Sequence, residues 1–424
     1  MKKKMFFNMG VLSLSNIIVR VIGMLYKVWL AKEISPVALG LHQLSMSVYS
    51  VFITPVASGL PNATSRLCAK YLNDSKEKNV LASAIKIAFV PLIISTVIML
   101  FGKDLIAGVF LHDKSAGGVI LALIPAVTLG GLASLPQGLL HAKGKSALPA
   151  VFEIIEQLLK IACAFVLVKL FKNTSQQTQA ALPAIAISFG GIVSFILLFL
   201  CVKGVNLKQG GFTKELLENA LPPTFARLGT SLLHLGTTTI LPIGLMAYGL
   251  TKETALSQYG ILTSMAYPIV FAPMTVIGAL CVVTLPEIAK NLNNKKVIIH
   301  KFRTSFLIAL IITVLFSVLV LLFAPYLAKT FFKQTMAGRF MVMLIPSIIF
   351  LGLSQVSRTL LNGLGKQKTL MVTSVVDGCF GLGLTYFLVW RFGIYGFILG
   401  NCIQDFLAFV INFSLCIREI KKVR

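Results

Sequence analysis

Twelve apolar stretches follow one another along the chain, and each is long enough to cross the hydrocarbon core of a bilayer. Backbone groups in lipid must be hydrogen-bonded inside the protein, and a helix satisfies them within one segment. Only 12% of the 424 residues are charged, about half the share of a soluble domain. We therefore predict an all-α polytopic membrane protein. The predicted spans are 6–30, 41–64, 80–101, 118–140, 148–170, 180–202, 219–249, 256–285, 303–323, 339–362, 369–390 and 394–417.

The two halves of the chain repeat each other in order and spacing. The run Leu123-Ile124-Pro125 and the later Gly144-Lys145 return as Leu344-Ile345-Pro346 and Gly365-Lys366, both at an offset of 221. Each half holds six spans, so both halves begin on the same side of the membrane, which is the parallel repeat of many transporters. We predict two six-helix lobes related by a pseudo-two-fold axis along the membrane normal. The N-lobe is 1–207, a cytoplasmic linker is 208–218, and the C-lobe is 219–424.

The basic residues are distributed unevenly between the connections. Of 39 Lys and Arg, 23 lie in or beside the terminal and even-numbered connections and 10 in or beside the odd-numbered ones. This is the positive-inside pattern, and it explains the net charge of +25 without nucleic-acid binding. Both chain ends are predicted to be cytoplasmic. The seven cysteines form no C-x-x-C pair, so we expect neither a disulfide framework nor a metal site.

The first span carries cations on one helical face. Arg20, Gly23 and Lys27 are spaced by three and four residues, and Arg227 and His234 match Arg20 and Lys27 at an offset of 207. A charge in mid-bilayer costs about 3 kcal/mol, so this face should turn toward protein or water. One interpretation is that these side chains bind an anionic substrate group, because a guanidinium matches phosphate well. The alternative is that Arg20 pairs with an intramembrane acid, Lys27 snorkels, and His234 is a packed polar residue.

The second span carries a weakly polar face that ends near a basic residue. Gln43, Ser47 and Thr54 share this face, which suits either a carbohydrate path or helix packing. Arg66 follows at the cytoplasmic end, as a gate or as an ordinary positive-inside anchor.

Acidic residues inside the spans are candidates for gating or ion coupling. Glu153, Glu156 and Lys160 open the fifth span, with Glu156 and Lys160 in the favourable order for an ion pair. Asp377 and Asp405 lie in the last two spans, and Glu156 falls opposite Asp377 at the offset of 221. Intramembrane acids are functional candidates by default, although each could also neutralise a structural cation.

The segment 138–146, GLLHAKGKS, has the composition of a phosphate-binding loop. Its spacing is one residue too long for that motif and no strand precedes it, so we interpret it as a short basic connection.

Four segments, 16–27, 40–50, 59–67 and 150–160, resemble the stage V sporulation protein B group. That group belongs to the multidrug/oligosaccharidyl-lipid/polysaccharide (MOP) exporter superfamily, which includes the lipid II flippases. Many members have fourteen spans, two more than we count here. The resemblance implies two six-helix lobes around a central cavity that opens alternately to each side, and a lipid-linked saccharide as cargo. Its motif positions are Arg20, Gly23, Tyr26, Lys27, Gly40, Gln43, Gly59, Pro61, Ala63, Ser65, Arg66, Glu156 and Gln157.

We hypothesise a flippase for a polyprenyl-pyrophosphate-linked saccharide, working as a monomer in the bacterial cytoplasmic membrane. Arg20, Lys27 and Arg227 would hold the pyrophosphate. Possible partners are the lipid bilayer and enzymes of cell-envelope synthesis. No cofactor is expected, and a coupling ion, Na⁺ or H⁺, is left open. A cation-coupled multidrug antiporter of the MATE type is the first alternative, followed by a membrane enzyme acting on lipid-linked sugars and by a structural protein.

Overall fold

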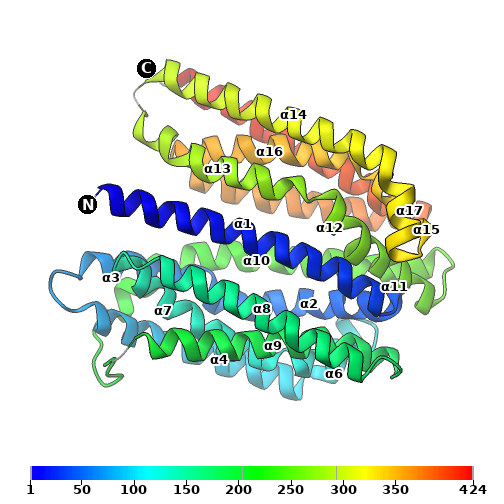
Figure 1. The fold of residues 1–424 in the computed structure, drawn as a ribbon, viewed down its shortest axis with the longest axis horizontal. Coiled ribbons are helices and arrows are strands. Elements are labelled where there is room, and N and C mark those ends of the chain that lie inside the picture. The colour runs from blue at the N-terminus through cyan, green and yellow to red at the C-terminus, as the bar shows by residue number, and fades with distance from the viewer. Residues whose placement is uncertain (1, 203, 293, 423–424) are drawn as a thin grey trace. The chain divides into compact units, whose positions relative to one another are not determined.

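The computed structural model describes the backbone of residues 2–202, 204–292 and 294–422, and their side chains except those of 2–14, 16 and 110. Every regular element in these ranges is a helix (Figure 1), so the all-α prediction is confirmed. The chain forms two compact units. Unit 1 comprises 1–26 and 33–235, and unit 2 comprises 27–32 and 236–424.

Unit 1 is built around α9, which contacts α2, α6, α7 and α8, while α3 packs against α4 and α7. The glycine pair Gly190-Gly191 in α9 lies at these contacts, since a Cβ at either position would be 3.4 Å from the nearest atom of α8 or of the π-helical turn at 126–130. Its helices are α1 (Lys2–Glu33), α2 (Pro36–Ala57), α3 (Gly59–Lys70), α4 (Glu77–Phe101), α5 (Lys103–Leu105), a π-helical turn (Ile106–Phe110), α6 (Ala116–Ala122), a second π-helical turn (Ala126–Gly130), α7 (Gly131–Ala142), α8 (Ala147–Leu170), α9 (Gln176–Leu200) and α10 (Thr213–Ala247), of which α1 and α10 continue into unit 2.

Unit 2 is built around α16, which contacts α13, α14 and α17. Its last helix is interrupted at Gly393, whose φ of +60° is left-handed, so two helical rods cover the last two predicted spans. Its further helices are α11 (Lys252–Gly260), a π-helical turn (Ile261–Ala266), α12 (Tyr267–Val270), α13 (Pro273–Lys290), α14 (Lys295–Leu327), a π-helical turn (Ala328–Phe332), α15 (Thr335–Met343), α16 (Ile345–Gly363) and α17 (Gln367–Lys422).

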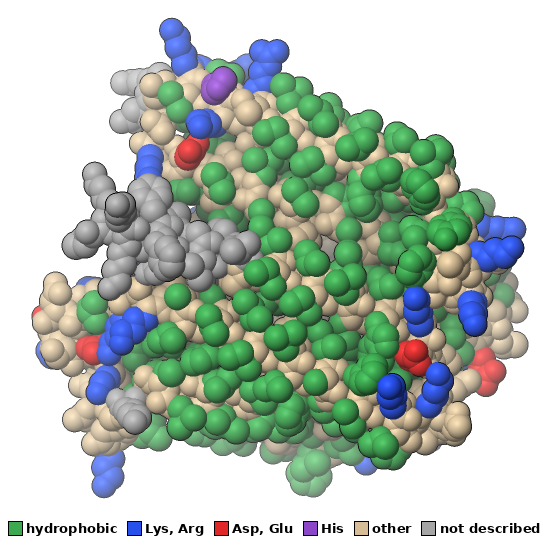
Figure 2. All heavy atoms as spheres, in the orientation of Figure 1, with side chains coloured by type: hydrophobic (Ala, Val, Ile, Leu, Met, Phe, Trp, Pro, Cys, Tyr) green, Lys and Arg blue, Asp and Glu red, His purple; other side chains and the backbone are tan. Residues whose placement is uncertain are grey.

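Several helices have the length and hydropathy of membrane spans. Seven described helices pass this test, or up to nine if two bent pairs are each taken as one span. In this count α17 is one helix, and α8 is absent because every 18-residue window in it contains Glu153, Glu156 and Lys160. Helical segments nevertheless cover all twelve predicted ranges. Figure 2 shows hydrophobic side chains over the middle of the helices of each unit and Lys and Arg toward helix ends, as lipid contact requires.

The repeat seen in the sequence is also a repeat of backbone geometry. The helix pair α6–α7 bends by 41° at Leu123-Ile124-Pro125, and α15–α16 bends by 47° at Leu344-Ile345-Pro346. Proline lacks the N–H that would continue the helical ladder, which accounts for both bends. The turns that follow both need a left-handed residue, supplied by Gly144 (φ +67°) and Gly365 (φ +74°).

The two bends are closed by different side chains. In unit 1 the Ser188 hydroxyl accepts from Ala126 N (3.2 Å) and donates to Ala122 O (2.5 Å). In unit 2 the Cys402 thiol donates to Met343 O (3.5 Å) and accepts from the Ser347 hydroxyl (3.4 Å). Buried backbone groups freed by a bend need such partners, and a hydroxyl bonds them more strongly than a thiol.

Candidate functional site

The cationic face of α1 meets the polar face of α8 in unit 1. A Cβ on Gly23 would lie 3.1 Å from Gln157 Nε2, so the absence of a side chain there lets the two helices approach closely. Arg20 is exposed and its guanidinium attracts the carboxylate of Glu153. Lys27 is also exposed and belongs to the stretch 27–32, which is part of unit 2. The side chains of Ser13 and Asn16, which begin this face, lie outside the described part of the chain.

Glu156 lines a small cavity of about 130 Å³, which we call the unit-1 pocket. The Ser194 hydroxyl of α9 bonds the Glu156 carboxylate, and Tyr49 of α2 lies on the wall of the same cavity. Lys160 donates to Gln157 Oε1 and attracts both Glu153 and Glu156. Glu156 and Lys160, which were predicted to pair, thus attract each other within a polar cluster on α8.

A larger polar cavity of about 510 Å³, the unit-2 pocket, lies between α13, α16 and α17. Asp377 and Asp405 come from the two rods of α17 and both line it, facing Arg358 of α16. The Arg358 guanidinium donates to Ser374 Oγ at 2.5 Å, and Gln404 Nε2 donates to the backbone carbonyl of Asp377 at 3.1 Å. Both predicted coupling acids therefore share one half-buried site with a cation. Among the described residues, no three His, Cys, Asp or Glu side chains cluster as metal ligands would.

The two pockets occupy the same position in the repeat. Glu156 of the unit-1 pocket corresponds to Asp377 of the unit-2 pocket at the offset of 221, and Gln137 corresponds to Arg358. This agreement places equivalent polar sites in both halves of the molecule. The remaining equivalent lining positions are Ile53 and Met274, Gly130 and Leu351, Ala133 and Ser354, Ser134 and Gln355, and Ile187 and Ala408.

The polar face of α2 lies against the first half of α10. The hydroxyls of Ser50 and Thr54 contact the Ser231 hydroxyl at 3.4 and 3.2 Å, and Ser58 donates to Thr224 Oγ1 at 3.4 Å. These contacts explain why 213–235 groups with unit 1, whereas the predicted lobe boundary at 208–218 stays a prediction.

The predicted substrate residues on α2 and α10 differ in exposure. Ser47 is buried and donates to Leu44 O, and Thr54 is buried as well, while Gln43 is half-buried. Arg227 and His234 of α10 are both exposed, and Ser231 between them faces α2. Along α10, exposed basic side chains thus alternate with hydroxyls used in packing.

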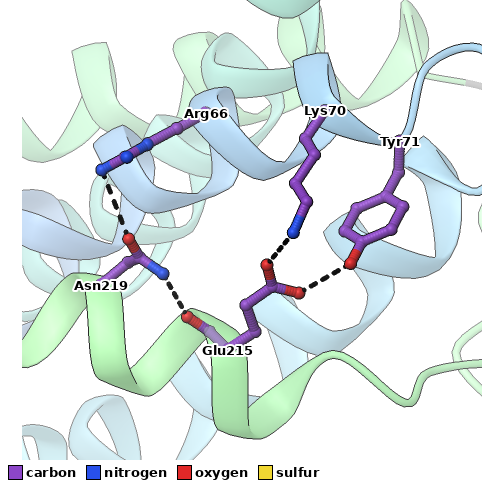
Figure 3. Close-up of polar contacts among 5 residues, drawn as sticks. All are labelled: Arg66, Lys70, Tyr71, Glu215 and Asn219. Carbon is purple, nitrogen blue, oxygen red and sulfur yellow. Dashed lines mark hydrogen bonds and ion pairs between the residues drawn. The ribbon is translucent and has the colours of Figure 1, made fainter.

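Arg66 belongs to a polar cluster that joins α3 to the start of α10 (Figure 3). Its Nη1 donates to Asn219 Oδ1 at 3.5 Å. Glu215 accepts from Lys70 Nζ at 2.7 Å and from the Tyr71 hydroxyl at 3.0 Å, and Asn219 Nδ2 donates to the Glu215 carbonyl at 2.7 Å. Figure 3 shows all five side chains converging between the two helices. We call these residues the α3–α10 latch.

Sequence reasoning located the charged residues of these sites better than their neutral neighbours. Arg358 carried a signal, because it is a cation within an apolar span. Tyr49 and Ser194 carried none, since they reach Glu156 from α2 and α9 only in the folded chain.

Comparison with known proteins gives consistent matches. The profile of the polysaccharide biosynthesis protein family matches residues 6–292, and the MatE profile matches 237–387. Stage V sporulation protein B of Bacillus subtilis is 24% identical over 398 residues, covering 90% of this chain and 77% of the relative. The lipid II flippase MurJ of the same organism is 22% identical over 460 positions, covering 99% and 84%.

Solved transporters share the fold. A multidrug resistance MATE family transporter of the MOP superfamily in an inward-facing conformation superposes with a TM-score of 0.80 at 15% identity, covering 96% of this chain and 98% of that one. A MOP superfamily transporter from Pyrococcus furiosus, described as having a binding pocket of reverse polarity, superposes with a TM-score of 0.69 at 16% identity, covering 98% and 96%. The prediction of a MATE/MOP fold is confirmed.

Proposed function

We propose, from the premise that the chain belongs to the polysaccharide biosynthesis protein family, that it flips a polyprenyl-pyrophosphate-linked saccharide across the bacterial cytoplasmic membrane. The chain is a multi-pass transporter of the MOP superfamily rather than an enzyme. The relative MurJ of Bacillus subtilis is a lipid II flippase, which supports cargo of this class.

The observation that carries the proposal is the exposure of Arg20, Lys27 and Arg227 within helices that are largely apolar. Cations held in such helices are costly unless they meet water, protein or an anionic ligand. Arg227 forms no ion pair with a described acid, and Arg20 has Glu153 as its electrostatic partner. A pyrophosphate offers the negative charge and the acceptor oxygens that arginine side chains bind best.

Ion coupling is the proposed role of the unit-2 pocket. Asp377 and Asp405 lie together in a half-buried cavity, where uptake of one Na⁺ or H⁺ would change the net charge beside Arg358. Such a change alters the balance between conformations when the ion binds them unequally. Glu153, Glu156 and Lys160 form the corresponding cluster in unit 1, which we assign to orienting Arg20.

The α3–α10 latch is the proposed gate. It lies in two basic connections, which the positive-inside pattern places in the cytoplasm together with both chain ends. Opening toward the cytoplasm would separate α10 from α3, and closure would restore the bonds of Glu215.

Transport of a labelled polyprenyl-pyrophosphate saccharide in liposomes tests this function. The readout is the rate at which the label becomes accessible to an impermeant enzyme outside. Arg20→Ala and Arg227→Ala should each slow this rate at least tenfold, because each loses a charge-assisted bond of about 1.5–3 kcal/mol. Arg303→Ala is the matched control, since Arg303 is an exposed arginine of α14 outside the proposed site.

Equal rates for all four proteins would contradict the proposal. The two carboxylates of the unit-2 pocket favour one other candidate, a cation-coupled multidrug antiporter, because a cationic drug is attracted to acids. If wild type exchanges cationic dyes against a Na⁺ or H⁺ gradient but never exposes the lipid label, that function replaces the flippase.

A further inference from the structure

A third cavity lies at one end of unit 1 and shares no lining residue with the unit-1 pocket. It has a volume of about 290 Å³ and is lined by the start of α4, the turn after α7 and the end of α9. Because water occupies about 30 Å³ per molecule in the liquid, a hydrated phosphate group fits. Three lysines line it, Lys78, Lys143 and Lys145, and we call it the lysine pocket.

The charge of the lysine pocket is only partly neutralised inside the protein. Glu77 binds Lys143 Nζ at 3.0 Å and so fixes this lysine in place. The side chains of Lys78 and Lys145 form no hydrogen bond or ion pair with another described residue, although Lys78 also attracts the Glu77 carboxylate. The pocket therefore keeps an excess of about two positive charges at a place where an anion could enter.

The repeat shows that the turn does not need this charge. Lys145 corresponds to Lys366 of unit 2, which binds Glu419 at 2.8 Å, and Glu419 also binds Lys422. At the same offset of 221, Glu419 corresponds to Leu198 and Lys143 corresponds to Leu364. Unit 2 thus closes the same turn with an acid, whereas unit 1 lacks that acid and adds lysines.

The rest of the lining is largely apolar and partly accessible. Leu139 and Leu140 are buried in it, while Leu200 is 63% exposed and Cys201 beside it is exposed. An ammonium cluster next to an exposed apolar helix end matches a ligand with an anionic head and an acyl tail. A free phosphate would use the lysines but leave Leu200 uncovered.

We infer that the lysine pocket binds the phosphate of an anionic phospholipid, with Lys78, Lys143 and Lys145 around the headgroup and the acyl chain over Leu200. None of its lining residues is a proposed substrate cation, so the inference does not depend on the transported molecule.

Cys201 provides a native reporter for the test. The purified full-length protein is placed in detergent micelles doped with phosphatidylglycerol or with phosphatidylcholine, and alkylation of each cysteine by a maleimide is followed by peptide mass spectrometry. Phosphatidylglycerol should slow alkylation of Cys201 at least fivefold relative to phosphatidylcholine. Cys379 is exposed in unit 2 and should react equally in both.

Matched variants separate the pocket from general surface charge. Lys78→Gln with Lys145→Gln should raise the half-maximal protecting concentration of phosphatidylglycerol roughly thirtyfold, since each lysine near an anionic lipid contributes about 1 kcal/mol, or about fivefold. Lys143 is left in place because its loss would leave the Glu77 carboxylate without its ion-pair partner. Lys76→Gln with Lys208→Gln removes the same charge from exposed lysines that do not line the pocket, and should change the concentration less than twofold.

Three results would overturn the inference. One is equal protection of Cys201 by both lipids, and another is an equal loss in the two double variants. The third is that millimolar inorganic phosphate without lipid protects Cys201 as well, which would make this a site for free anions. Because no step of the test requires transport, its outcome is independent of the flippase assay.

Discussion

The unit-1 and unit-2 pockets occupy equivalent positions in the repeat, but the charges of their lining residues differ. The unit-1 pocket has one carboxylate, Glu156, bonded by Ser194, in about 130 Å³. The unit-2 pocket has Asp377, Asp405 and Arg358 in about 510 Å³. Only Glu156 lines the unit-1 pocket, with Glu153 and Lys160 as its electrostatic neighbours, whereas two acids and a cation all line the unit-2 pocket, where we propose ion coupling. A repeated backbone can thus keep its geometry while the charged residues that line the two equivalent cavities differ.

Replacing one acid in each pocket should give the largest effect, and it tests whether the two pockets have different roles. Asp405→Asn should lower the ion-driven flipping rate about a hundredfold, equivalent to about 3 kcal/mol, because one of the two carboxylates proposed to take up the ion is lost. Glu156→Gln should stay within about threefold of wild type, because its partner Ser194 can bond an amide as well. Initial rates in liposomes under a Na⁺ or H⁺ gradient measure both. A larger loss in Glu156→Gln would reverse the roles assigned to the two pockets.

Two equivalent glycines beside the pockets, Gly131 and Gly352, differ in how tightly they are packed. A Cβ at Gly352 would lie 2.6 Å from Thr313 Cγ2 and 2.9 Å from Ile277 Cδ1, whereas at Gly131 the nearest atom is Leu92 Cδ2 at 3.3 Å. Gly352→Ala should therefore destabilise the protein by about 1–3 kcal/mol. Gly131→Ala should stay within about 1 kcal/mol, since the helix propensity of alanine offsets the small adjustment. Thermal unfolding in detergent compares them, and equal shifts would show that the two halves are packed alike.

The smallest effect is expected at the ends of the repeats. Glu215 accepts from both Lys70 and Tyr71 in the α3–α10 latch, while Glu287 of α13 pairs with Lys301 at 2.5 Å. Glu215→Gln should change the flipping rate two- to fivefold, because it loosens the start of α10. Glu287→Gln should leave the rate unchanged, as expected for an exposed ion pair. If both variants behave like wild type, the latch has no gating role.

Much of the fold could be predicted because lipid allows few solutions. The spacing of apolar runs predicted helical ranges that the structure fills, and Leu-Ile-Pro at an offset of 221 indicated the repeat, whereas the bends at both runs are seen only in the structure. The π-helical turns at 126–130 and 328–332 could not be predicted, because one extra residue in a helical turn leaves no compositional signal.

The candidate sites were predicted less completely. Asp377 and Asp405 stood out as acids within apolar spans, and the structure brings them together. Thr54 belonged to a polar face with two interpretations, and its hydroxyl contacts Ser231 of a helix some 177 positions later in the chain. Such contacts depend on which helices become neighbours, and hydropathy does not contain that information.

The hydrogen bonds at the two helix bends differ in strength, so the two bends differ in stiffness. The Ser188 hydroxyl bonds the backbone on both sides of the unit-1 bend and so restrains this bend. The unit-2 bend is held through the longer and weaker bonds of the Cys402 thiol. Under a force along the helices, the bend at Met343–Ser347 should therefore deform before the bend at Ala122–Ala126. The half with the charged pocket is thus also the half with the more compliant hinge beside it.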